Sequence, residues 1–457
     1  MSLVLKLVGF VLFFQLHTAL ALNLPMPEVE ELPNGLKVVW FVKDSLPLID
    51  LSVFVKAGYR DDSEGKSGTL ELLSALFERG PAKKESGPSS LPMSKTGESF
   101  GAIRTVIPDD DSVSIGYHGL AQDAYELLEL LGQEVLQSHF SIQQVKQAHS
   151  YISDRRSQVL SSSEGLAQIA WQRSVFASTN YARGGFASMK EFSHVGREDI
   201  IQFYNKFFTP KNSFLLVAGR VDRPSFKKKI LSIFGQWQGS EPQHFMKIYR
   251  DARLHRKREK ILLVDRRGEN QVQIRLGMRA PVIRSSDQTS LLVGNAILGE
   301  HFNRLGLAYS VQSILGFKKD DTDWMISSLA PSEGVGSLIS GILEVLKTIK
   351  KGAFTEEEVE GAKVYLQGGF PLTVSSLNLV ASRWLSMTLF GLKEDYLSGY
   401  IDRMGQVNSK QVQEVLFKTI DLDRIVVVLV GDAMKITPSL RKAGLGSIKK
   451  VSASDLQ

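Results

Sequence analysis

The sequence predicts an α+β protein of two homologous domains, each a mostly antiparallel sheet with helices packed on one face. Two observations lead to this class. Three separate segments of the first half recur in the same order in the second half. Each half also places short apolar or alternating runs, typical of strands, between longer segments with apolar residues at helical spacing. Strands that bury one face and helices that bury one stripe pack together in layers.

The repeated segments keep an almost constant spacing along the chain. FSIQQVKQAHSYI from Phe140 matches FTEEEVEGAKVYL from Phe354 (354 − 140 = 214). FLLVAGRVD around Gly219 matches VVVLVGDA around Gly431 (431 − 219 = 212). A third pair, DDDSVSIGYHGL and DDTDWMISSLAP, begins at positions 109 and 320 (320 − 109 = 211). Chance similarity would not hold so steady an offset, so we expect the second half to repeat the fold of the first.

The elements follow in chain order. Half-buried strands are predicted where residues alternate or run apolar, at Val38–Val42, Ile49–Val55 and Ser112–Tyr117. Central strands are predicted where short β-branched runs end in glycine, at Phe214–Ala218 and Ile425–Val430. Helices are predicted where apolar residues recur at helical spacing, at Thr69–Arg79, Asp123–Leu136, Ile142–Leu160 and Glu198–Phe207.

These elements divide the chain into five parts. The first domain is expected at 22–235 and the second at 261–435. The polar, basic stretch 236–260 is rich in turn residues and is expected to be the linker. Beyond Ala433 the helical and strand periodicity is lost, so residues 436–457 are expected to form a poorly ordered tail.

The amino-terminal 21 residues have the three parts of a secretory signal peptide. Lys6 forms the basic region, Leu7–Leu16 the apolar region, and Ala19-Leu20-Ala21 the small-x-small cleavage site. An uncleaved membrane anchor is the alternative, but the apolar run is shorter than the ~20 residues that span a bilayer. No later segment is long and apolar enough to cross a membrane. We therefore expect a periplasmic or secreted protein.

Composition excludes several classes of site. The chain has no cysteine, which rules out disulfides and thiolate metal sites and suits a bacterial periplasm better than a eukaryotic secretory route. The formal charge is +6, with basic residues gathered at Lys227–Lys229 and Arg250–Lys260. No nucleic-acid motif accompanies them, so these runs are interpreted as solvated surface and no nucleic-acid partner is expected.

Four segments of the chain stand out. Gly58–Gly80 reads GYRDDSEGKSGTLELLSALFERG and resembles the frame around the zinc-binding helix of the insulinase/pitrilysin zinc peptidases, the family of the mitochondrial processing peptidases. Leu32–Trp40 resembles the opening strand, Tyr181–Asp222 the end of the first domain, and Gly306–Val311 (GLAYSV) a strand of the second domain. The resemblance covers nearly everything after the signal peptide and implies two domains that face each other as a clamshell.

The residues that would carry catalysis are replaced. The resemblance places the first zinc-binding histidine at Glu71, the glutamate base at Ser74 and the second histidine at Ala75. Two histidines one helical turn apart can share a zinc ion, whereas alanine has no donor atom and serine is no base near neutral pH. The region of the third ligand, Phe140–Arg156, contains no glutamate. We therefore expect a non-catalytic member of the family with no cofactor of its own.

The resemblance also implies a partner. Many members work as pairs in which one subunit carries zinc, and the zinc-free subunit holds peptide substrate through a tyrosine and an arginine near the GLAYSV strand. The tyrosine corresponds to Tyr309. Arg304 is the candidate for the arginine, although only Asn303-Arg304-Leu305 separate Phe302 from Gly306, where the family has a longer basic helix. The substrate-binding edge is altered too, since Gly101–Arg104 stands where the family has N-A-x-T.

Three hypotheses follow. The favoured one is a non-catalytic subunit of a periplasmic peptidase that pairs with a zinc-bearing homologue and helps to enclose peptide substrate. The second is a structural scaffold or peptide-binding protein with no role in proteolysis, which the shortened segment after Phe302 supports. The third is an enzyme with a displaced metal site built from Glu71, His149 or Asp154.

Overall fold

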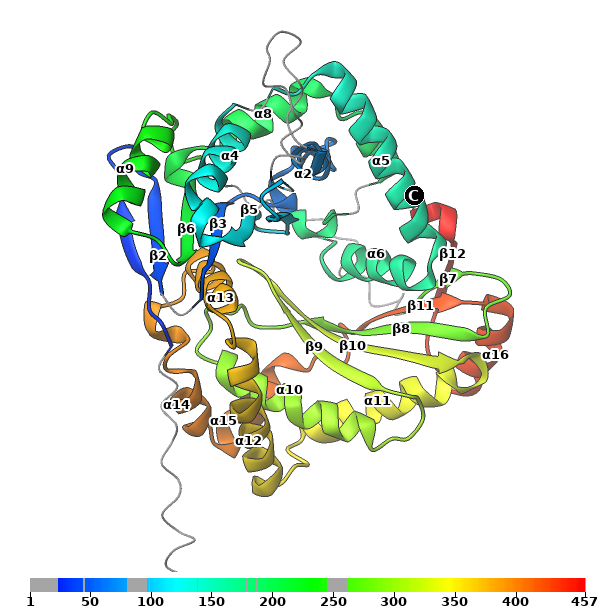
Figure 1. The fold of residues 1–457 in the computed structure, drawn as a ribbon. Helices are drawn as coiled ribbons and strands as arrows, with labels where there is room; N and C mark the ends of the chain where they lie inside the picture. Colours follow the sequence, from blue (N-terminus) through cyan, green and yellow to red (C-terminus); the bar gives the residue numbers. More distant parts are fainter. Residues whose placement is uncertain are drawn as a thin grey trace, which may run out of the picture.

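The computed structural model describes residues 24–456 except 44–45, 80–96, 98, 138, 178, 186–187 and 245–260. The signal peptide expected at 1–21 and most of the linker expected at 236–260 lie outside the described residues. The described part confirms the predicted α+β class, because it contains two six-stranded sheets with helices packed on them (Figure 1).

The first sheet is mixed and mostly antiparallel. Its strand order is β1-β2-β6-β3-β5-β4, and only β2 and β6 pair in parallel. The strands are β1 Glu28–Glu31, β2 Lys37–Val42, β6 Ser213–Gly219, β3 Leu48–Val55, β5 Val113–Leu120 and β4 Ile103–Pro108. The central strand β6 is buried along its whole length, as its apolar sequence predicts.

The second sheet repeats five of these six positions. Its order is β12-β7-β11-β8-β10-β9, so β7 corresponds to β2, β11 to β6, β8 to β3, β10 to β5 and β9 to β4. The strands are β12 Ile448–Ser452, β7 Ile261–Asp265, β11 Val426–Gly431, β8 Gln271–Arg279, β10 Thr322–Pro331 and β9 Val311–Phe317. The sixth position differs, because β1 pairs antiparallel with β2 whereas β12 pairs in parallel with β7.

The structure corrects the prediction of a poorly ordered tail at residues 436–457. Residues Ala433–Lys442 form helix α16, which begins with the Asp432 carboxylate accepting the Met434 N–H. After one turn, β12 completes the edge of the second sheet. The Gly/Ser/Lys composition of this region gave no clear periodicity. In particular, β12 is an edge strand with two exposed lysines, so its sequence has little apolar character.

The outer face of each sheet carries most of the helices. In the first half these are α2 Thr69–Arg79, α4 Ala124–Leu136, α5 Ile142–Ser161, α8 Arg197–Phe207 and α9 Arg223–Phe234. In the second half they are α10 Gln288–Asn303, α11 Val335–Lys350, α12 Glu356–Thr373, α14 Tyr400–Gly405, α15 Ser409–Thr419 and α16. Each set closes one large apolar core against its own sheet.

One helix from each half crosses to the other half. Helix α6 (Ser163–Val175) of the first half packs on β11 and β8 of the second sheet, and α13 (Leu377–Leu389) of the second half packs on β6 of the first sheet (Figure 1). Helices therefore cover both faces of each sheet, whereas the sequence predicted one. The helix on the inner face belongs to the opposite domain, which periodicity within one domain cannot show.

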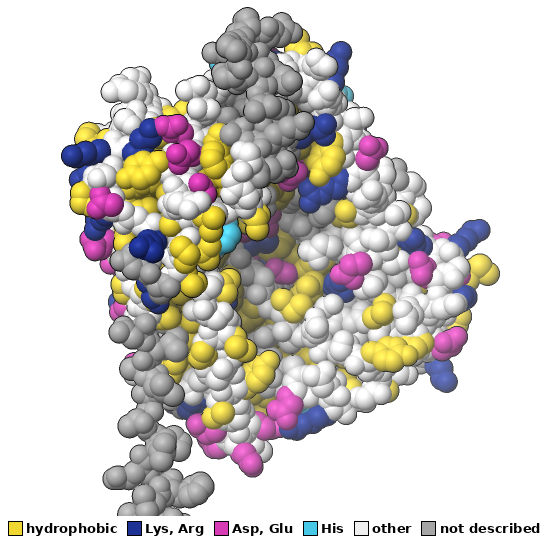
Figure 2. Space-filling model, in the orientation of Figure 1, with side chains coloured by type: hydrophobic (Ala, Val, Ile, Leu, Met, Phe, Trp, Pro, Cys, Tyr) yellow, Lys and Arg dark blue, Asp and Glu magenta, His cyan; other side chains and the backbone are white. Residues whose placement is uncertain are grey.

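The two halves also meet through matching hairpin turns. Lys318 Nζ, in the β9–β10 turn, pairs with Asp110 in the β4–β5 turn, and Lys319 N–H donates to Asp111 Oδ2 at 2.8 Å. Arg60 bridges both turns, with Nε 3.1 Å from Asp111 Oδ1 and Nη1 2.5 Å from Asp320 Oδ2. Burial raises the pKa of Asp111, and the Arg60 charge opposes that rise. The surface seen in Figure 2 is hollowed where the halves meet.

None of the described helices is both long enough and apolar enough to span a lipid bilayer.

The crossed helices generate a prediction about stability. Leu385→Ala removes a fully buried side chain of α13 that belongs to the core on the first sheet, so we expect it to cost about 2–5 kcal/mol of unfolding free energy. The matched control Leu379→Ala, on the exposed side of the same helix, should cost about 0.5 kcal/mol. Amide hydrogen exchange should speed up in β2 and β6 of the first half. Faster exchange confined to the second half would show that α13 does not stabilise the first sheet.

Candidate functional site

Helix α2 contains Glu71, Ser74 and Ala75, the positions where the resemblance places the zinc ligands and the base, and a buried carboxylate fixes its start. Asp62 accepts hydrogen bonds from the backbone N–H groups of Gly68 at 2.7 Å and Leu70 at 3.0 Å, two donors that the first turn cannot satisfy itself. Burial raises the pKa of Asp62 to about 7, although these two hydrogen bonds lower it. The helix then buries Leu70, Leu72, Leu73, Leu76 and Phe77, as its sequence predicts.

A buried ion pair forms at Glu71, the position where the resemblance places the first zinc-binding histidine. Glu71 on α2 accepts hydrogen bonds from Arg156 on α5, from Nε at 3.0 Å and from Nη2. Both side chains are buried, and the guanidinium carbon lies 4.1 Å from the centre of the Phe192 ring. Burial raises the pKa of Glu71, and the hydrogen bonds and charge of Arg156 oppose that rise. The Arg156 guanidinium thus compensates the buried carboxylate of Glu71.

Sequence reasoning missed Arg156. The segment Phe140–Arg156 contains no glutamate for zinc, but its last residue is the cation that neutralises Glu71. The only available signal was a pair of complementary charges on two predicted helices, and such a pair has no fixed spacing along the chain.

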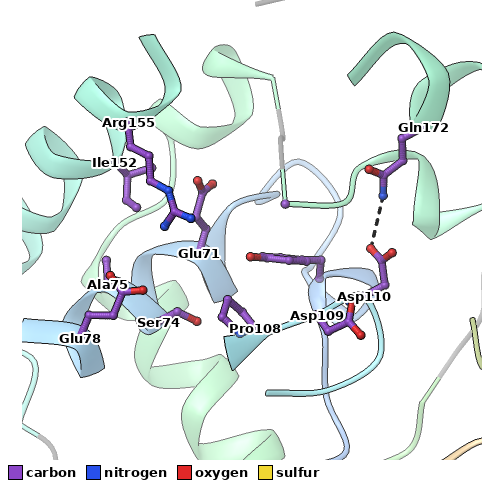
Figure 3. Close-up of a pocket in the computed structure, with 12 residues that line it drawn as sticks. Glu71, Ser74, Ala75, Glu78, Pro108, Asp109, Asp110, Ile152, Arg155 and Gln172 are labelled. Atoms are coloured by element: carbon purple, nitrogen blue, oxygen red, sulfur yellow. Dashed lines mark hydrogen bonds between the residues drawn. The ribbon is translucent and has the colours of Figure 1, made fainter. Parts of the chain in front are cut away.

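Ser74 and Ala75 lie beside this ion pair and line a cavity of about 190 Å³ (Figure 3). Ser74 is only 2% exposed, and its hydroxyl has no hydrogen-bond partner among the described residues. Ala75 is 1% exposed and contributes only a methyl group. The remaining lining residues come from the first half as well: Tyr59, Glu71, Glu78, Pro108, Asp109, Asp110, Ile152, Arg155, Gln172 and Gly185.

The displaced metal site does not assemble. His149 Nε2 donates to the Val195 carbonyl at 2.8 Å, and Asp154 is exposed on α5. Glu71 is held by Arg156. Across the described ranges, no group of three or more histidine, aspartate or glutamate side chains is placed to hold a metal ion. The hypothesis built on Glu71, His149 and Asp154 is therefore not supported by the positions of these residues.

The two candidate substrate-binding residues lie in the second half, away from the cavity beside α2. Tyr309 is 88% exposed in the turn between α10 and β9. Arg304 ends α10 and is held by two carboxylates, Glu300 Oε1 at 2.5 Å and Glu358 Oε1 at 2.9 Å. Tyr309 is thus available to a partner or peptide, whereas Arg304 would first have to leave both carboxylates.

The altered edge strand directs its arginine away from the edge. Arg104 on β4 pairs with the buried Glu134 of α4, which also accepts a hydrogen bond from Tyr117 at 3.2 Å. The outward side of β4 has no neighbouring strand in the described part of the chain. Ile103 and Ile107 are 62% and 59% exposed there. The backbone edge that could pair with an extended peptide is therefore retained although the side chains have changed.

Comparison with protein families and curated proteins gives a consistent result. Residues 194–366 match the family described as the peptidase M16 inactive domain. The zinc protease PqqE of Helicobacter pylori is 22% identical over 395 residues, which cover 82% of this chain and 84% of that protein. Mouse cytochrome b-c1 complex subunit 2 is 21% identical over 375 residues, covering 76% and 77% of the two chains.

Solved structures share the fold. A protease from Helicobacter pylori superposes with a TM-score of 0.77 at 19% identity and covers 89% of this chain and all of its own. A peptidase M16 inactive domain from Pseudomonas fluorescens gives a TM-score of 0.75 at 18% identity, with 89% and 98% coverage. These findings confirm the resemblance to insulinase/pitrilysin-type peptidases and the clamshell-type architecture.

The ion pair beside α2 generates a prediction. Arg156→Met leaves the buried Glu71 carboxylate without its partner, so we expect a loss of about 3–5 kcal/mol of unfolding free energy. The double variant Glu71→Gln/Arg156→Met should recover most of that loss in urea denaturation. Lys146→Met, which removes an exposed cation from the same helix, should change stability by about 0.5 kcal/mol at most. If the stability losses of Glu71→Gln and Arg156→Met measured singly add up to that of the double variant, the two residues are not coupled.

The buried Asp62 carboxyl generates a second prediction. Its pKa of about 7 exceeds the unfolded value of 3.8, so the folded state holds a proton that the unfolded state releases between these pH values. Unfolding free energy should therefore fall as pH rises from about 4 to about 7, by up to ~1.4 kcal/mol per pH unit from this group. Asp62→Asn keeps an oxygen for the helix N–H groups but cannot titrate. Urea denaturation at pH 5 and pH 7.5 should show a smaller loss for the variant, and equal losses would refute the assignment.

Proposed function

We propose that this chain, a member of the peptidase M16 family that carries the family's inactive domain, is a non-catalytic subunit that pairs with a zinc-bearing homologue. The observation that carries the proposal is the ion pair of Glu71 with Arg156 in place of metal ligands. Ser74 and Ala75 beside it offer neither a base nor a ligand in the positions of the glutamate and the second histidine. The fold is kept while the hydrolytic chemistry is replaced.

Three features support a role in holding peptide. The first sheet retains an edge strand, β4, whose outward backbone groups could pair with an extended chain. Tyr309 stands almost fully in solvent, where its phenol could hydrogen-bond to a peptide held in the partner's catalytic site. Arg304 is the weaker candidate, because Glu300 and Glu358 already bind its guanidinium. We assign Tyr309 as the substrate-positioning residue and Arg304 as an auxiliary one.

The proposed location is the periplasm or the outside of the cell. It rests on the sequence of residues 1–21 and on the absence of cysteine from the chain. Zinc is expected only in the partner, and the substrate class is an unfolded peptide.

A second function is a structural scaffold with no part in proteolysis. One similar protein, mouse cytochrome b-c1 complex subunit 2, is by its name a subunit of a respiratory complex. The capture of Arg304 by two carboxylates and the shortened segment before Gly306 favour this alternative, since both weaken the substrate-holding element.

Reconstitution separates the two functions. The partner is to be sought as a co-purifying homologue with an intact H-x-x-E-H motif, and the pair assayed for cleavage of unstructured peptides. We expect cleavage by the pair to exceed that by the zinc subunit alone. If adding this chain leaves the rate of cleavage unchanged, the proposal is rejected and the structural scaffold is the remaining function.

Tyr309→Phe should lower kcat/KM of the pair about tenfold, the effect of one lost hydrogen bond to a polar group in the bound state. Tyr365→Phe is the matched control, because Tyr365 is also strongly exposed, at 74%, but lies on α12. We expect the control to leave kcat/KM unchanged. Equal activity of the two variants would remove Tyr309 from the proposed role without affecting the pairing.

A further inference from the structure

The cavity beside α2 carries more negative than positive charge. It is lined by four carboxylates and one guanidinium: Glu71, Glu78, Asp109, Asp110 and Arg155. Arg156 neutralises Glu71, and Lys318 neutralises Asp110. Among the described residues, no cation lies within ion-pair distance of Glu78 or Asp109, although the Arg104 charge acts on Glu78 and the Lys318 charge on Asp109 from further away. Of the described lining residues, two carboxylates therefore remain without a direct ion pair against the one guanidinium of Arg155. A single positive charge would balance these groups.

A hydroxyl without a partner lies in the same cavity. Ser74 is 98% buried, and within the described part of the chain its Oγ makes no hydrogen bond. Leaving a buried hydroxyl unbonded is unfavourable, and a bound polar group would remove that cost. Figure 3 shows Ser74 and Glu78 on the side of α2 that faces the cavity, with Arg155 on the neighbouring helix.

Tyr59 adds an aromatic ring to this lining. Burial raises the pKa of Tyr59 far above its ordinary value, so the phenol stays neutral and its ring face keeps its attraction for a cation. The volume of about 190 Å³ is well above what one water molecule needs and admits a small organic group.

We infer that this cavity binds a primary ammonium group, either the amino terminus of a peptide or the side chain of a lysine. An ammonium group donates three hydrogen bonds and accepts none, which matches a hydroxyl oxygen and two carboxylates. A metal ion fits less well, because the described residues offer it no group of three ligands here. The site uses the space beside the replaced zinc ligands, and it does not depend on a partner subunit.

The test is isothermal titration of the isolated full chain with four probes. Alanyl-alanyl-alanine amide presents a free amino terminus, and Nα-acetyl-lysine amide presents a free lysine side chain. Their fully acetylated counterparts lack the charge and are the controls. We expect one of the free amines to bind at least about tenfold more tightly than its acetylated form, and the one that does so identifies the source of the ammonium group. Equal binding of charged and acetylated probes, or no binding of either amine, would overturn the inference.

Variants locate the binding within the cavity. Ser74→Ala and Glu78→Gln should each weaken binding of the favoured amine about tenfold, since each removes one hydrogen-bond acceptor for the ammonium. Ser67→Ala is the matched control for serine, because Ser67 is equally buried and lacks a partner among the described residues but does not line the cavity. Glu126→Gln is the control for an exposed glutamate on α4. Equal effects of site and control variants would show that the amine binds elsewhere.

A steric variant keeps the test valid if a polar substitution disturbs the fold. Ala75→Leu fills the cavity without changing any charge and should abolish binding. Thermal unfolding of each variant shows whether the chain is still folded. Since the titration uses this chain alone, its outcome is independent of whether the chain pairs with a peptidase.

Discussion

Each sheet of this protein has two apolar faces, and neither half of the chain can cover both of its own. Phe41, Phe54 and Phe214 on the inner face of the first sheet are buried by Trp384 and its neighbours on α13, which belongs to the second half. Val428 and Val430 of the second sheet are buried in turn by α6 of the first half. This mutual covering fixes how the halves face each other and therefore where the edge strands and the cavity beside α2 lie.

Within that frame, helix α2 is stabilised by a charge pair with α5. A buried carboxylate without a partner would be costly, and Arg156 from α5 supplies the compensating charge together with two hydrogen bonds. Because Glu71 lies on α2 and Arg156 on α5, the pair also ties these two helices together.

The sequence predicted the elements whose signal is local. Strong periodicity or β-branched runs located β3, β6, α2, α4 and α5 to within about two residues, and the constant offset between repeats predicted the second sheet. Features that depend on distant parts of the chain were not predictable in this way. The destination of α6 and α13, the pairing of β12 with β7 and the partner of Glu71 all involve residues far apart in sequence. Tyr309 stays a prediction of the sequence, and its exposure depends on the turn that precedes β9.

The crossed helices also change what the covalent connection between the halves contributes. Because each half carries a helix that completes the other's core, the noncovalent surface between them is as essential to folding as the core of a single domain. A chain cut in its linker would yield two fragments, each with an uncovered apolar sheet face, that fold fully only when they associate. The protein is in this sense an intertwined dimer of its own repeats, and the peptide bonds between them serve mainly to keep the two copies at high effective concentration.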